Sequence, residues 1–166
     1  MVTAEDEIVD PVCGMPVAVD LNAVDYLGMH FAFCSLQCKE RFLANPHLYI
    51  GQPGQTSFKQ EGGNVLKRRG FRLTTPLTKA MSAQLTDEIQ SMMGIKDIDI
   101  NGDTIEITYD LVEATALQIE SRLEAVGAVL GRDRGQGLRR AFVHFSEETE
   151  VDSLENAPSS HGQHHH

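Results

Sequence analysis

The stretch Phe33–Tyr49, FCSLQCKERFLANPHLY, decides the fold of the N-terminal part of this chain. Cys34 and Cys38 are four residues apart, and Asn45-Pro46 ends the run. The spacing predicts a short helix with both sulfurs on one face, about one turn apart. Thiolates near the start of a helix are stabilised by its backbone amides, which favours metal binding.

The third cysteine, Cys13, lies in the segment DPVCGM at residues 10–15. Pro11 and Gly14 predict a tight turn that presents the sulfur from a loop. Clustered cysteines in a chain without a secretion signal more often bind metal than form disulfides, and a disulfide would leave one of the three cysteines over. The alternative is that the three cysteines are unrelated buried thiols. Their position within residues 13–38, with no cysteine in the rest of the chain, argues against this alternative.

The residues leave the fourth ligand of such a site open. Met15 offers a thioether that suits copper(I), whereas His30 and His47 offer imidazoles that also suit zinc. Each also has a structural explanation: Met15 packs, His30 lies outside a strand, and His47 is solvated at a helix end. Three thiolates alone can bind copper(I), but structural zinc normally takes four ligands.

This part of the chain resembles the YHS family, close to the TRASH-type metal-binding modules. The resemblance rests on DPVCGM at 10–15, the pattern YxGxxFxFCSxxC at 26–38, and then Phe42, Asn45-Pro46 and Tyr49. It implies a treble-clef-like fold in which Cys13, Cys34 and Cys38 hold a soft metal. It also implies a link to heavy-metal handling, including copper-transporting ATPases.

The first domain is predicted at residues 1–50, and the Gly- and Gln-rich run GQPGQTSFKQEGGN predicts a linker over 51–65. A second domain is predicted at 66–146, because its periodicity alternates between strand and helix. The predicted elements are a strand with Phe71 and Leu73, a helix from Thr75-Pro76 to Gly94, a hairpin turning at Asn101-Gly102, a helix with a Thr115/Gln118 capping box, and a strand over Leu138–Phe145.

This βαββαβ order predicts a ferredoxin-like domain, and with the small module an α+β fold class. Around MGI at 93–95 and ITYDLVEATALQIESRLEAVG at 107–127 the segment resembles the heavy-metal-associated (HMA) domain. The two cysteines of that family's metal loop are replaced here by Thr78 and Met81, so its metal site is not expected. Met81 is expected in the core, and the domain is expected to dock, dimerise or recognise a partner.

The composition excludes several classes of partner. The net charge of −10 and the pI near 5.0 argue against a nucleic acid or an anionic membrane. No signal peptide and no membrane-spanning apolar run is evident, so a cytoplasmic protein with reduced thiols is expected. The acidic stretch 147–166 is predicted to be disordered. Its final histidines fit a native metal-binding tail or a shortened tag, and the incomplete six-histidine run slightly favours the native tail: His161, His164, His165 and His166.

These patterns predict a cytoplasmic heavy-metal-binding protein, a copper(I) carrier, buffer or accessory factor for metal efflux that binds the ion through three cysteines. A metal-transporting P-type ATPase is an expected partner. The alternatives are a structural zinc module in a protein-recognition protein, or a thiol redox protein using Cys34 and Cys38, whose spacing differs from the usual C-x-x-C. No enzyme is expected, since no catalytic triad or carboxylate pair stands out.

Overall fold

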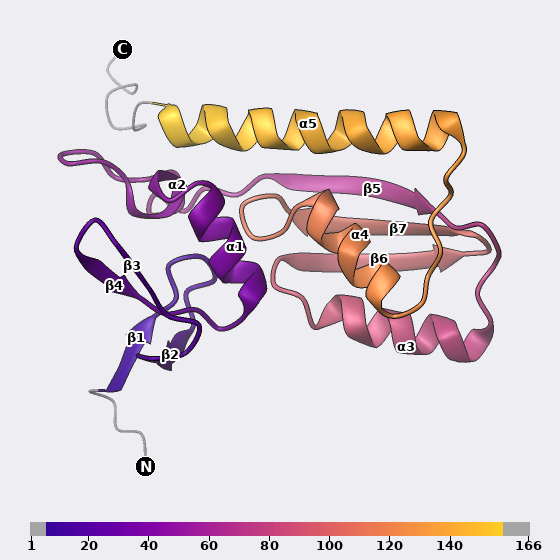
Figure 1. Ribbon diagram of the computed structural model, residues 1–166, viewed down its shortest axis with the longest axis horizontal. Coiled ribbons are helices and arrows are strands. Elements are labelled where there is room, and N and C mark those ends of the chain that lie inside the picture. The colour runs from indigo at the N-terminus through magenta and orange to yellow at the C-terminus, as the bar shows by residue number, and fades with distance from the viewer. Residues whose placement is uncertain (1–5, 158–166) are drawn as a thin grey trace. The chain divides into compact units, whose positions relative to one another are not determined.

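The computed structural model describes residues 6–157 and mixes helices with antiparallel strands, which confirms the α+β class (Figure 1). The chain forms two compact units. The first comprises the residues up to Asn64 together with those from Val151 onward, and the second comprises Val65–Glu150. Within the described range, no helix combines the length and the apolar character needed to cross a membrane.

Two small hairpins begin the first unit. Strand β1 (Glu7–Val9) pairs with β2 (Pro16–Ala18), and β3 (Val24–Tyr26) pairs with β4 (Met29–Phe31). Between β3 and β4 the two loop residues Leu27 and Gly28 both have positive φ, 52° and 78°. This is the type I′ geometry that matches the twist of a two-residue hairpin.

The predicted helix is α1 (Leu36–Ala44), and it is followed by a single turn, α2 (His47–Ile50). Helix α1 begins where the Ser35 side chain accepts a hydrogen bond from the Cys38 backbone. Phe42 is fully buried at the centre of an aromatic cluster, with ring centroids 4.7 to 6.3 Å from its own. The other rings of this cluster belong to Tyr26, Phe31, Phe33 and Tyr49.

The second unit is a three-stranded antiparallel sheet with helices against one face. Its strands are β5 (Leu66–Arg72), β6 (Ile95–Asn101) and β7 (Thr104–Asp110), in the order β5-β7-β6. Alternate residues of β7 are fully buried, namely Ile105, Ile107 and Tyr109. The hairpin at Gly102 and the Thr115/Gln118 capping box, which starts α4 (Ala116–Ala125), confirm their predictions.

Helix α3 (Lys79–Gln90) begins later than predicted. Its N-cap is Thr78, whose side chain accepts a hydrogen bond from the Met81 backbone, so Thr75-Pro76 lies outside the helix. The expectation that Met81 belongs to the core is wrong, because its side chain is 41% exposed. The apolar face of α3 is carried instead by Leu85 and Ile89.

The strand predicted over Leu138–Phe145 is wrong, since this segment lies in a long helix, α5 (Arg134–Asn156). A single antiparallel bridge, Leu73 with Leu130, occupies the free edge of β5 before that helix. The predicted fourth strand of a ferredoxin-like sheet is therefore absent from the described residues. The apolar pattern was misleading because the side chains of three large apolar residues in this segment are about two thirds exposed: Leu138, Phe142 and Phe145.

Disorder was also predicted over 147–166, yet residues 147–156 belong to α5. In the first unit, the Asn45 amide donates to the Asp152 and Glu155 carboxylates, at 2.7 and 2.9 Å. The backbone N–H of His47 donates to Glu155 at 2.8 Å, at the start of α2. The acidic residues that suggested disorder are thus hydrogen-bond acceptors. The four terminal histidines lie outside the described residues.

Replacing Glu147 with alanine is expected to destabilise the second unit. Glu147 is buried and accepts hydrogen bonds from the Tyr109 hydroxyl and, at 2.7 Å, from the Ala116 backbone N–H. Its loss leaves two buried donors unsatisfied, so the free energy of unfolding should fall by about 2–4 kcal/mol in urea denaturation. The exposed neighbour change Glu148→Ala is the control; equal losses in the two variants would contradict this role.

Candidate metal centre

Cys13 lies in the loop that joins β1 to β2. Two backbone hydrogen bonds close this loop, from Asp10 N to Met15 O at 2.9 Å and from Gly14 N to Asp10 O at 2.8 Å. Gly14 has a φ of 82°, a conformation that residues with a Cβ rarely adopt. The Pro/Gly turn predicted from the sequence therefore holds the Cys13 sulfur on a short, rigid loop.

The other two cysteines meet this loop at the start of α1. Cys34 comes immediately before the N-cap residue Ser35, and Cys38 is fully buried in the first turn. The Cys34 sulfur lies 3.5 Å from that of Cys13 and 3.6 Å from that of Cys38. The structure thus brings together the three cysteines singled out in the sequence, and all three are free thiols.

Asp10 is the fourth member of this cluster, and the sequence analysis missed it. Its carboxylate is fully buried, with an oxygen within 4.8 Å of all three sulfurs. One oxygen accepts the N–H groups of Val12 (2.7 Å) and Cys13 (3.2 Å), and the other accepts that of Cys34 (2.8 Å). The available signal was an Asp directly before a Pro turn, where its side chain commonly hydrogen-bonds the backbone two residues on.

The electrostatics of the cluster favour a single ionised sulfur. Hydrogen bonding from the Cys38 thiol and from the Met15 backbone lowers the pKa of Cys13. Burial raises the pKa of Cys34 to about 11, and the hydrogen bond to Cys13 together with burial raises that of Cys38. Three adjacent thiolates repel one another, and the Asp10 charge adds to this, so full ionisation requires a cation among them.

The donor set fits a thiophilic metal ion. A tetrahedral site with metal–sulfur bonds of about 2.3 Å places its sulfurs about 3.8 Å apart, close to the spacing found here. Thiolates suit both copper(I) and zinc. Cys13, Cys34 and Cys38 could hold the ion, and an Asp10 oxygen lies near enough to join them. Among residues 6–157 this is the one such group of metal-binding side chains.

The histidines considered as fourth ligands are not in this cluster. His30 is exposed, with one ring nitrogen 2.7 Å from the Asp25 carboxylate and the other 2.7 Å from the Val19 carbonyl oxygen. The ring nitrogens of His47 lie 3.2 Å from the Tyr26 hydroxyl and 2.7 Å from the Gly51 carbonyl oxygen. Both rings therefore have other partners, and Met15, whose side chain is half exposed, remains the thioether candidate.

Comparison with known families agrees with the position of this site. Residues 8–53 match the YHS domain, a span that contains Asp10 and all three cysteines. No curated protein and no solved structure matches the chain. The resemblance of the second unit to the heavy-metal-associated domain has no such family match and stays a prediction. Residues 8–53 thus match the YHS domain and contain a cysteine and aspartate cluster suited to a metal ion.

Proposed function

We propose that this chain is a cytoplasmic copper(I)-binding protein, a carrier, buffer or accessory factor for metal efflux, and not an enzyme. The observation that carries this proposal is the three-sulfur cluster, in which neighbouring sulfurs lie 3.5 and 3.6 Å apart. The nearby Asp10 carboxylate already accepts three backbone N–H groups. That leaves three thiolates as the principal donors, and three thiolates alone suffice for copper(I), whereas structural zinc normally takes four ligands.

The exposure of the site supports exchange of the ion with a partner. Cys13 and Cys34 are only partly buried, whereas Cys38 is fully buried. A partner's thiolates can approach the ion from the side of the two exposed sulfurs and replace them one at a time. A metal-transporting ATPase fits this role through the family resemblance alone.

Structural zinc is the second candidate, favoured by a different observation. The sulfur spacing is close to that of a tetrahedral site, and the Asp10 oxygen within 4.8 Å supplies a fourth donor. In that case the ion would stabilise the first unit, and the protein's function would rest on recognition by the second. The two candidates differ in which ion binds tightly and in whether its removal unfolds the first unit.

Cysteine substitutions test the ligand set. The chain with His161, His164, His165 and His166 changed to alanine is titrated with copper(I) against a chromogenic chelator. Loss of a residue that only hydrogen-bonds a metal ligand typically weakens metal binding by about 10–100-fold. Cys34→Ser and Cys38→Ser each remove a ligand itself, so each should weaken copper(I) binding by more than about 100-fold.

Met29→Leu is the matched control, because it removes an exposed sulfur that is not a candidate ligand and keeps the side chain's size. It should retain one copper(I) per chain. Unchanged affinity in the two serine variants would refute the copper proposal. Stoichiometric zinc that leaves only when the first unit unfolds would favour the structural alternative.

Asp10→Asn tests the role of the buried carboxylate. Both carboxylate oxygens of Asp10 accept backbone N–H groups, but an amide has only one oxygen. Its NH₂ group would face a backbone N–H, two donors with no acceptor between them, so the segments that carry the cysteines should lose their alignment. Copper(I) affinity should fall by about 10–100-fold with the stoichiometry kept. The exposed Asp20→Asn is the control. A loss as complete as in the cysteine variants would instead make Asp10 a direct ligand.

A further inference from the structure

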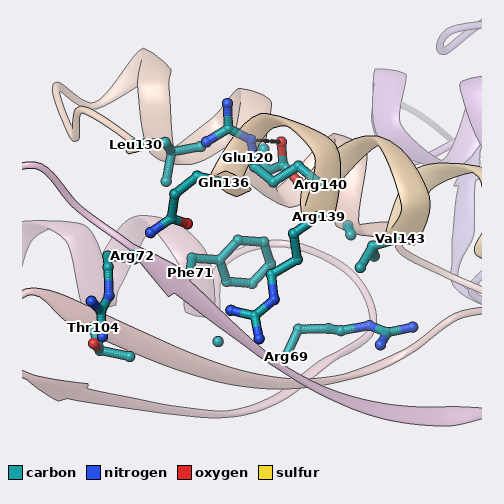
Figure 2. Close-up of a pocket in the computed structure, with 12 residues that line it drawn as sticks. Arg69, Phe71, Arg72, Thr104, Glu120, Leu130, Gln136, Arg139, Arg140 and Val143 are labelled. Atoms are coloured by element: carbon teal, nitrogen blue, oxygen red, sulfur yellow. Dashed lines mark ion pairs between the residues drawn. The ribbon is translucent and has the colours of Figure 1, made fainter. Parts of the chain in front are cut away.

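A pocket of about 140 Å³ lies in the second unit, between β5 and the first turns of α5. Four arginines line it, out of 14 lysines and arginines in a chain whose net charge is −10. The buried ring of Phe71 forms part of its wall, with the side chains of Gln136 and Arg139 near that ring and that of Arg72 next to Thr104 (Figure 2). The pocket therefore concentrates positive charge next to an aromatic face.

Two of the arginines are engaged by the protein itself. The Arg140 guanidinium donates to the Gly131 carbonyl oxygen and lies 3.5 Å from Glu120. Arg69 Nε lies 3.5 Å from the Glu147 carboxylate, outside good hydrogen-bond geometry, and is buried without a hydrogen-bond partner. Glu120, the one carboxylate in the pocket wall, also accepts from His144, at 2.7 Å.

The other two, Arg72 and Arg139, have no side-chain hydrogen bond or ion pair with any residue in the described part of the chain. Guanidinium groups are planar forks of donors that match carboxylate and phosphate groups, often through two parallel hydrogen bonds. The Gln136 amide adds an uncharged donor to the same wall, whereas the Thr104 hydroxyl already donates to the Asp103 carboxylate, at 3.3 Å. The pocket is thus rich in donors and short of acceptors.

We propose that this pocket binds a small organic anion, in which a carboxylate or phosphate group meets Arg72 and Arg139 and a compact flat body lies against Phe71. The volume supports a ligand of this size, because a cavity of about 150 Å³ accommodates one benzene ring. All residues of the pocket belong to the second unit, so this site is separate from the cysteine cluster.

Calorimetric titration of the full chain tests this with phenyl phosphate, benzoate and benzyl alcohol as probes. We expect phenyl phosphate or benzoate to bind, and the uncharged alcohol to bind at least about tenfold more weakly. Arg72→Gln and Arg139→Gln should each lower the affinity for the anion by about tenfold. Both side chains are exposed at the pocket rim, so circular dichroism should show intact folding.

Arg134→Gln is the matched control, since it removes the same charge at an exposed position that does not line the pocket. It should leave anion binding unchanged. A preference for phenyl phosphate assigns the phosphate class, and a preference for benzoate assigns the carboxylate class. No binding of either anion at about 10 mM, or an equal loss in Arg134→Gln, would overturn the proposal.

Discussion

The candidate metal centre depends on the hydrogen bonds of one buried carboxylate. Asp10 accepts N–H groups from the Cys13 loop and from Cys34, segments more than 20 residues apart in the sequence. These bonds hold the β1–β2 loop against the start of α1, and so bring the Cys13 sulfur next to the other two. Because the carboxylate is hydrogen-bonded to both segments that carry the cysteines, it fixes the distance between them before an ion binds. Less rearrangement of the chain is then needed for metal binding.

The same arrangement places negative charge where the thiols must ionise. The hydrogen bond to Cys13, burial and the Asp10 charge raise the pKa of Cys38, while hydrogen bonding lowers that of Cys13. A metal cation removes this conflict by neutralising the thiolates it binds. The cluster is thus better suited to holding an ion than to remaining as three thiols, and this links the local fold to the proposed function.

The sequence predicted the features that rest on local chemistry: the cysteine cluster, the Gly102 turn and the Thr115 capping box. It failed at α5, because that helix turns polar residues such as Glu147 inward and leaves Phe142 exposed. Asp10 was missed because an Asp before a Pro turn indicates a hydrogen bond to the nearby backbone and not a position among three sulfurs.

The central claim is that three thiolates, without a histidine, bind a soft metal ion in the first unit. X-ray absorption spectroscopy of the chain loaded with one equivalent of copper(I) tests it most directly, with the four terminal histidines replaced so that only this site contributes. The account predicts a first coordination shell of three sulfur atoms. A shell containing imidazole nitrogen, or fewer than three sulfurs, would contradict it.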